Sequence, residues 1–273
     1  MMMPEFIFRR IGRRHLLVAG LLIGLQSLHA SAREITVAAA SDLQFVFPEI
    51  AARFQKETGC SVRLIFGSSG NFYSQIQNGA PFDLFFSADS GYPNSLEKAG
   101  LAEPGALRLY AVGQIVLWAP RGSSLDVNRG LVALLDPGVR KIAIANPGHA
   151  PYGRAAVAAL RSEKVYDRVS GKLVLGENIS QAAQFVQSGA ADAAILALAL
   201  VASPAMNGAG KYHVVPADDY PPLEQAAVVL KSSKQKAAAR QFLEFLREPE
   251  IQSLMRDFGF LAPESRKPAS SKP

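Results

Sequence analysis

The sequence is poor in the residues and motifs that mark most enzymes and cofactor proteins. It has one cysteine, Cys60, which excludes a disulfide framework and is predicted to be a small buried side chain. It has no G-x-S-x-G, Walker or G-x-G-x-x-G motif, and no spacing of His, Cys, Asp and Glu that suggests a transition-metal site. His149 is interpreted as a solvated loop residue. These absences predict a protein that is not an enzyme and that needs no cofactor.

The distribution of charge argues against one class of partner. The chain of 273 residues has a net charge of +6, but its lysines and arginines are scattered along the sequence. A nucleic-acid interface needs basic residues in a cluster with interleaved aromatic side chains, and the sequence shows no such cluster. Nucleic acid is therefore not an expected partner.

Residues 1–32 have the order of a secretory signal peptide. Two arginine pairs precede the apolar run Leu16 to Leu28, and the small residues Ala30-Ser31-Ala32 follow it. Thirteen residues of helix reach roughly 20 Å, which is too short for a hydrocarbon core of ~30 Å. We predict cleavage after Ala32 and export by the general or the twin-arginine route. The cleavage site has no cysteine, which excludes a lipid anchor there.

From Glu34 onward, short apolar runs alternate with segments of helical spacing, which predicts an α/β fold with largely parallel strands. The predicted strands are 35–39, 62–66, 83–88, 114–118, 141–145, 173–175, 193–196 and 225–230. The predicted helices are a segment from Leu43 to near Gly59, then 72–77, 153–160, 180–187, 234–246 and 249–258. Pro48 is expected to kink the first of them or to delay its regular part.

The last two helices are expected to complete a lobe that the first strands begin. The chain would then cross between two lobes twice, and two crossings make a hinge. We predict a first lobe of residues 33–115 plus 231–263, a second lobe of 116–230, and a disordered tail, 264–273, that is polar and rich in Pro and Ser.

Four turns share one local design, in which an apolar strand is followed by small or constrained residues and then by a helix start. A helix N-terminus offers unpaired N–H donors and a partial positive charge, so it suits an anion. Each turn taken alone is more typical of an ordinary helix cap. Four of them in two halves favour an anion site at the ends of the strands. The turns are Ala40-Ser41-Asp42, Gly67-Ser68-Ser69-Gly70, 146–153 and Glu177-Asn178-Ile179-Ser180.

At these turns the sequence resembles the periplasmic molybdate-binding proteins of ABC transporters. The resemblance runs from about Ile35 to Leu261 and is carried by VAAASDL, FGSSGNFYSQIQNGAPFDLFFSAD, IANPGHAPYG, GENISQAAQFVQSGAADAAI and EPEIQSLMRDFGF. It implies a two-lobed type II periplasmic-binding-protein fold, in which each lobe is a mixed, mostly parallel sheet flanked by helices.

The resemblance also implies the ligand contacts. Ser41 and Ser69 would bind an oxyanion through hydroxyl and backbone groups, and Asp42, Tyr152 and Ile179 would bind it through backbone N–H groups. Molybdenum or tungsten would be present only as the metal of that oxyanion, bound by the same residues.

Two positions depart from the family pattern. Some members have a tyrosine hydroxyl where this chain has Ala197, and others have an asparagine where it has Asp42. We expect the Asp42 carboxylate to turn away and cap its own helix, because it would repel a dianion. The alternative is a protonated ligand, such as hydrogen phosphate, that donates to Asp42.

The sequence as a whole predicts a periplasmic solute-binding protein. It would act as a monomer that captures molybdate or tungstate and delivers it to a membrane ABC permease. The alternatives are a binding protein for sulfate or hydrogen phosphate and, with less support, an exported enzyme on the same fold that uses Asp42 and His149.

Overall fold

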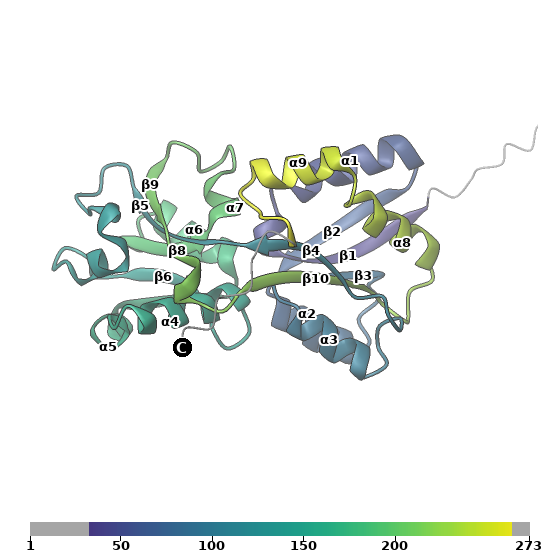
Figure 1. Ribbon diagram of the computed structural model, residues 1–273, viewed down its shortest axis with the longest axis horizontal. Helices are drawn as coiled ribbons and strands as arrows, with labels where there is room; N and C mark the ends of the chain where they lie inside the picture. The colour runs from purple at the N-terminus through teal and green to yellow at the C-terminus, as the bar shows by residue number, and fades with distance from the viewer. Residues whose placement is uncertain (1–32, 264–273) are drawn as a thin grey trace, which may run out of the picture. The chain divides into compact units, whose positions relative to one another are not determined.

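The structure of the protein is a computed structural model that describes residues 33–263 (Figure 1). The predicted signal peptide, 1–32, and the predicted tail, 264–273, lie outside the described residues. No helix within the described part is long and apolar enough to cross a membrane.

Strands and helices alternate through most of the chain. The strands are β1 (Glu34–Ala40), β2 (Ser61–Gly67), β3 (Leu84–Ser87), β4 (Arg108–Gly113), β5 (Ile115–Pro120), β6 (Ile142–Ala145), β7 (Leu173–Gly176), β8 (Ala193–Ala197), β9 (Gly210–Val214) and β10 (Leu223–Val229). The α-helices are α1 (Phe47–Thr58), α2 (Ser69–Gln77), α3 (Gly91–Lys98), α4 (Pro151–Ser162), α5 (Tyr166–Val169), α6 (Ile179–Gln187), α7 (Leu198–Val201), α8 (Lys236–Phe245) and α9 (Pro249–Asp257). The 3₁₀ segments are η1 (Ser41–Leu43), η2 (Val127–Leu135), η3 (Ser170–Lys172) and η4 (Ala217–Asp219).

The first lobe is built on a sheet with the strand order β2-β1-β3-β10-β4. Successive residues of a strand face opposite sides, so β1 serves two cores. Val37 and Ala39 pack with residues of α1, α8 and α9, whereas Ala38 packs with residues of α2 and α3. Figure 1 shows these two groups of helices on opposite faces of the sheet.

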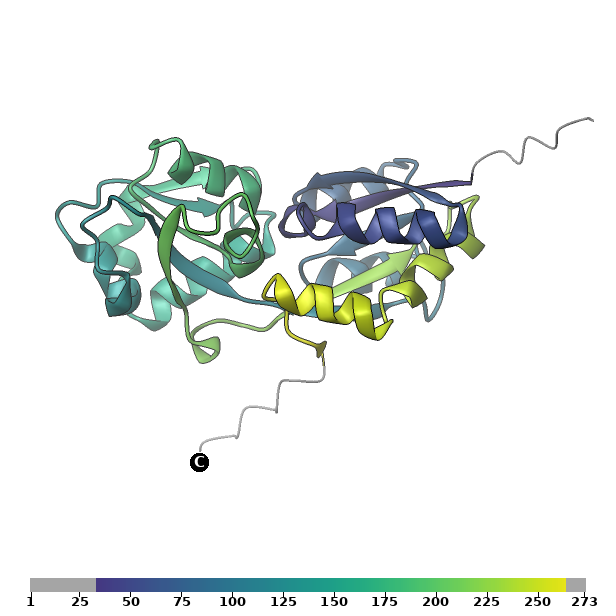
Figure 2. The same ribbon diagram turned by 90° about the horizontal axis from the view of Figure 1, so that it is seen from above.

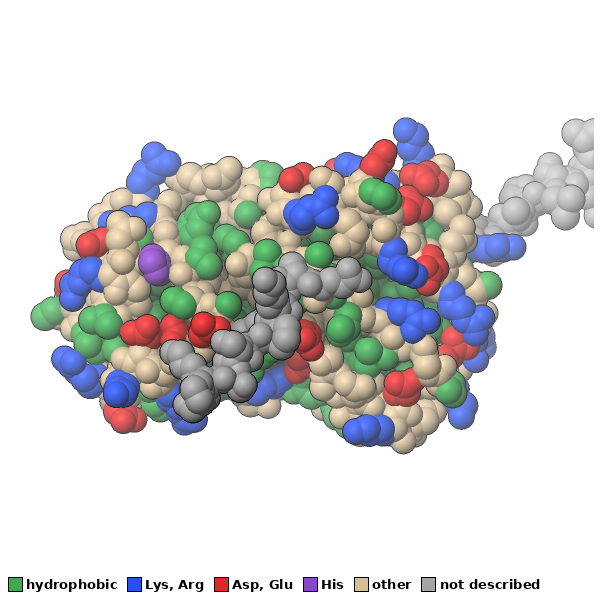
Figure 3. Space-filling model, viewed as in Figure 1, with side chains coloured by type: hydrophobic (Ala, Val, Ile, Leu, Met, Phe, Trp, Pro, Cys, Tyr) green, Lys and Arg blue, Asp and Glu red, His purple; other side chains and the backbone are tan. Residues whose placement is uncertain are grey.

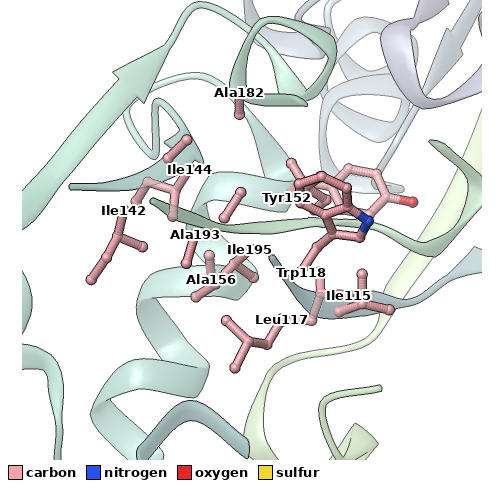
Figure 4. Packing of buried hydrophobic residues seen from close by; sticks show 14 of the residues in the cluster. Ile115, Leu117, Trp118, Ile142, Ile144, Tyr152, Ala156, Ala182, Ala193 and Ile195 are labelled. Atoms are coloured by element: carbon pink, nitrogen blue, oxygen red, sulfur yellow. The ribbon is translucent and has the colours of Figure 1, made fainter. Parts of the chain in front are cut away.

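The second lobe is built on a sheet with the order β7-β6-β8-β5-β9. Its core joins Trp118 of β5 and Ile144 of β6 to residues of α4 and α6, and Figure 4 shows how these side chains pack. The Tyr152 ring, from the first turn of α4, belongs to this core.

Each sheet is mixed, as predicted, but antiparallel pairing is as frequent as parallel pairing. β1 is parallel to β2 and β3, while β10 is antiparallel to β3 and β4. The second sheet repeats this pattern, with β6 parallel to β7 and β8, and β5 antiparallel to β8 and β9. The antiparallel strands are those that adjoin the two crossings between the lobes.

The chain crosses at Gln114, between β4 and β5, and again over residues 215–222, between β9 and β10 (Figure 2). The second crossing comes earlier than the predicted boundary, which left residues 116–230 in the second lobe. Pairing with β3 and β4 places β10 in the first lobe. The apolar run of β10 fits the interior of either sheet, so its sequence could not identify its partners.

Charged side chains are mixed over the face drawn in Figure 3. Lys and Arg lie among Asp and Glu there, and the basic net charge is not gathered in one patch on this face.

Candidate functional site

The ends of four strands meet around one cavity. β1 and β2 of the first lobe and β6 and β7 of the second each end where a turn leads to the next helical element. The cavity is small, with a volume of about 10 Å³. Its lining residues are Ala40, Ser41, Asp42, Gly67, Ser68, Ser69, Ala88, Ala150, Pro151, Tyr152, Asn178 and Ile179.

All five residues predicted to bind the ligand line this cavity. Ser41 and Asp42 form the start of η1, and Ser69 is the first residue of α2. Tyr152 lies in the first turn of α4, and Ile179 begins α6. The structure therefore brings together residues that are far apart in the sequence and that come from both lobes.

Three of the turns are N-termini of regular helices, which leave backbone N–H groups without a helical partner. At α6 the Asn178 side chain accepts hydrogen bonds from the N–H groups of Ser180 and Gln181, at 3.0 Å each, and this cap leaves the N–H of Ile179 outside it. At α4 a Cβ on Gly153 would lie 2.1 Å from the carbonyl oxygen of Ala145, so the first turn rests directly on the end of β6. The cavity wall thus consists largely of helix starts.

The Ser69 hydroxyl is fixed in position and can still donate a hydrogen bond into the cavity. Its Oγ accepts a hydrogen bond from the Ala88 N–H at 3.0 Å, which fixes the side chain and leaves the O–H free to donate. Ser41 is buried, and its carbonyl oxygen accepts a hydrogen bond from the Ser180 Oγ of the other lobe at 3.0 Å. Ser69 is therefore positioned through its hydroxyl oxygen, and Ser41 through its backbone carbonyl.

The Asp42 side chain does not cap its own helix, so that prediction is wrong. Its carboxyl oxygens make no hydrogen bond to the N–H groups of the following residues of η1. Instead, Asp42 Oδ2 accepts hydrogen bonds from the Tyr152 hydroxyl at 3.0 Å and from Gln225 Nε2 at 2.6 Å. Oδ1 is buried and has no hydrogen-bond partner among the described residues. Burial raises the pKa of Asp42 from 3.8 to about 6, although hydrogen bonds from Gln225 and Tyr152 and the residue's own N–H favour the ionised form.

Gln225 and Tyr110 were not predicted, and they complete this buried network. Gln225 is fully buried on β10; its Nε2 also donates to the Tyr152 hydroxyl at 3.0 Å, and its Oε1 accepts from the Tyr110 hydroxyl at 2.7 Å. Burial raises the pKa values of Tyr110 and Tyr152 well above 10, and the negative charge of Asp42 adds to the effect. One signal was present in the sequence, because a glutamine in the apolar run of a strand needs a polar partner.

The lobes contact each other around the cavity. The Gly70 N–H donates to the His149 carbonyl oxygen at 2.9 Å, and the Ser68 hydroxyl contacts the same oxygen at 2.9 Å and His149 Nδ1 at 2.8 Å. Arg154 of α4 pairs with Asp89 of the first lobe at 2.5 Å. The turn that carries His149 is therefore closed directly over the first turn of α2.

Gly70 allows this close approach of the two lobes. Gly70→Ala is expected to weaken ligand binding about 5- to 150-fold, because overpacking at this contact would cost about 1–3 kcal/mol of binding free energy. A Cβ there would lie 2.6 Å from the His149 carbonyl oxygen. That atom belongs to the backbone of the other lobe and cannot move without opening the lobes. The Tyr92 hydroxyl, also 2.6 Å away, is the end of a side chain of the same lobe that can turn aside, so the main effect is on closure. Calorimetric titration and thermal melting of the ligand-free protein would show this. Gly171→Ala, where a Cβ meets nothing within 4 Å, is the control. Unchanged affinity in Gly70→Ala would show that closure does not need this contact.

Sequence comparison agrees with the geometry. Residues 35–261 match the family described as bacterial extracellular solute-binding proteins. The chain belongs to this family. Its members' two-lobed periplasmic-binding-protein fold is the fold described above, with two mixed sheets flanked by helices.

Several relatives of this solute-binding protein are named for one anion. The chain is 39% identical over 241 residues to the molybdate-binding protein ModA of Rhodobacter capsulatus, covering 88% of this chain and 93% of the relative. It is 39% identical over 244 residues to that of Azotobacter vinelandii, covering 89% and 96%. The solved structure of the periplasmic molybdate-binding protein of Azotobacter vinelandii matches with a TM-score of 0.80 and 35% identity, covering 84% of this chain and all of that one.

A more distant structure shares only the fold. The sulfate-binding protein SubI of Mycobacterium tuberculosis has a TM-score of 0.68 at 16% identity, covering 85% of this chain and 88% of that one.

Of the two positions that depart from the family pattern, Ala197 is buried at the end of β8 and is not among the residues that line the cavity. Asp42 is therefore the departure that lines the cavity.

Proposed function

We propose that this protein captures molybdate or tungstate between its lobes and delivers the anion to an ABC permease. The observation that carries the proposal is the composition of the cavity wall. Apart from the Asp42 carboxyl group, it consists of helix N-termini and serine hydroxyls, with no Lys or Arg among the lining residues. Such a wall neutralises an oxyanion with N–H and O–H dipoles. The names of the two relatives at 39% identity support the same anion.

The proposed contacts can supply the affinity that a transport protein needs. Ser41 and Ser69 would donate hydroxyl and N–H groups, and Asp42, Tyr152 and Ile179 would donate backbone N–H groups. Hydrogen bonds to a charged group contribute about 1.5–3 kcal/mol each, so about six of them support micromolar or tighter binding after the cost of ordering.

Two alternatives have different support. Sulfate and hydrogen phosphate share the tetrahedral shape, so the same wall could hold them. An enzyme would need Asp42 and His149 to work as a pair, but Asp42 is bonded to Tyr152 and Gln225, whereas His149 contacts Ser68 and Glu177. Among the described residues no group of His, Cys, Asp and Glu is arranged to hold a metal ion. We therefore propose a binding protein without catalytic activity.

The cellular setting of this proposal follows from the family. Export to the periplasm, in which residues 1–32 act as the signal, would bring the protein to its permease. We propose that it acts there as a monomer.

Calorimetric titration of the purified protein against molybdate, tungstate, sulfate and phosphate tests the function. We expect molybdate and tungstate to bind at least tenfold more tightly than the other two anions, a difference of about 1.4 kcal/mol or more. Tight binding of sulfate or phosphate with no response to molybdate would overturn the assignment.

Ser69→Ala tests the location of the site. It removes a hydroxyl whose proton is free to meet an anion oxygen, so we expect a loss of about 1–3 kcal/mol, or about 5- to 150-fold in affinity. Ser74→Ala, on an exposed position of the same helix, is the matched control and should bind like the wild type. If both variants bind equally well, the ligand lies elsewhere.

A further inference from the structure

We propose that Asp42 binds the anion as a neutral carboxylic acid, with Oδ1 donating its proton in a hydrogen bond to an anion oxygen, so that each dianion is bound together with one proton. This inference rests on the proposed function, and it assigns to the Asp42 side chain a role in selecting the protonation state of the bound complex.

The two carboxyl oxygens of Asp42 have different surroundings. Oδ2 accepts from two donors, the Tyr152 hydroxyl and Gln225 Nε2. It therefore serves as the acceptor oxygen of the carboxyl group. Oδ1 is buried and unpartnered, and Asp42, which is 1% exposed, lines the cavity. Oδ1 is thus the oxygen left for the ligand.

Only one protonation state of this oxygen suits a dianion. An ionised carboxylate can only accept hydrogen bonds, and an oxyanion without protons can also only accept them. Two such groups in contact would repel each other inside a cavity from which water is largely excluded. The acid form turns Oδ1 into a donor and removes the charge. When the dianion binds, the ionised Asp42 carboxylate takes up one proton from solvent. The anion itself forms hydrogen bonds only, and no covalent bond to it is made.

Among residues 33–263, no positively charged group acts on Asp42 to hold it ionised. Tyr152 on α4 contacts it directly, and Tyr110 on β4 contacts it through Gln225 of β10. Both tyrosines stay protonated at neutral pH, because burial and the charge of Asp42 raise their pKa values. His149 is a second titratable group close to the cavity, where it contacts the Ser68 hydroxyl. Burial has already raised the pKa of Asp42 to about 6 without ligand, and an adjacent dianion would raise it further.

Calorimetry of the full chain at about pH 8, in two buffers with different heats of ionisation, measures proton uptake directly. We expect the wild type to take up about one proton per molybdate. Its affinity for molybdate should fall about tenfold for each pH unit between the pKa of the ligand-free Asp42 and that of the complex. Asp42→Asn should take up no proton and bind molybdate with a flat pH profile, because its amide offers one acceptor and one donor at all pH values. His149→Gln should keep the proton uptake of the wild type.

The outcomes separate this inference from the function on which it rests. Tight molybdate binding by the wild type without proton uptake would overturn the inference and leave the function standing. Tight binding of hydrogen phosphate that needs no proton from solvent and is lost in Asp42→Asn would mean that the ligand donates to Asp42, which overturns both. If neither the wild type nor Asp42→Asn binds molybdate at acidic or alkaline pH, while both melt cooperatively, the function itself is wrong.

Discussion

Replacing Phe242 with alanine is expected to lower the free energy of unfolding by about 3–5 kcal/mol. The Phe242 ring, on α8, is fully buried between β1-β3 and α1. It makes edge-to-face contacts with Phe54, Phe86 and Phe47, at centroid distances of 5.1, 6.0 and 6.2 Å. Removing it opens a cavity lined by three other rings, which cannot all move inward. The loss therefore includes both the transfer free energy of the ring and the cost of the cavity.

Urea or thermal denaturation of the ligand-free protein measures this effect. Glu244→Ala is the matched control, because it lies on the exposed side of the same helix and should change the stability by less than about 0.5 kcal/mol. If Phe242→Ala is as stable as this control, α8 does not belong to the core of the first lobe. Below the melting temperature, Phe242→Ala should still bind the anion, since it lies outside the cavity.

Periodicity made most of the elements predictable. The apolar residues of β1 alternate, and those of α1 and α8 recur at helical spacing, because each of these elements buries defined faces in a core. This spacing can be recognised in the sequence alone. Pro48 indeed delays α1, which begins at Phe47. β4 was missed because it begins with the exposed Arg108 and Leu109, so its pattern resembles a loop. The partners of β10 were missed for another reason, since strand pairing depends on residues far away in the chain.

The same division between local and distant information applies to the site. Helix starts are local features, so the turns at Ser41, Ser69 and Ile179 could be found from the sequence. The orientation of the Asp42 side chain could not. Its partners, Tyr152 and Gln225, lie 110 and 183 positions away, on another helix and in another strand. The capping role was expected because a carboxylate repels a dianion, and the backbone of its own helix is the only partner that lies near Asp42 in the sequence.

The buried carboxylate of Asp42 should make the ligand-free protein less stable as the pH rises. Its pKa in the folded protein is about 6, above the 3.8 of an exposed aspartate, so the folded state binds this proton more tightly than the unfolded state does. The stability that this residue contributes is therefore fully present below about pH 3.8 and is lost as the pH rises through about 6. The loss amounts to about 3 kcal/mol at most, taking about 1.4 kcal/mol for each unit of pKa difference.

Asp42→Asn should remove this loss. The asparagine is of equal size, does not ionise, and keeps an acceptor oxygen for Tyr152 and Gln225. We expect the ligand-free variant to be more stable than the wild type by up to about 3 kcal/mol at about pH 8, and to equal it near pH 4. Denaturation of both proteins at the two pH values measures the difference.

Gln225→Glu, placed in the same network, is the opposite control. It replaces a donor to Asp42 by a second acid and should destabilise the protein most at alkaline pH, where both groups would have to ionise within one buried cluster. A stability difference between Asp42→Asn and the wild type that does not change with pH would show that the Asp42 carboxylate is solvated in the ligand-free protein. Asp42 would thus lower the stability of the ligand-free protein, and binding of the anion would restore it. This is the pattern expected of a residue that serves binding rather than folding.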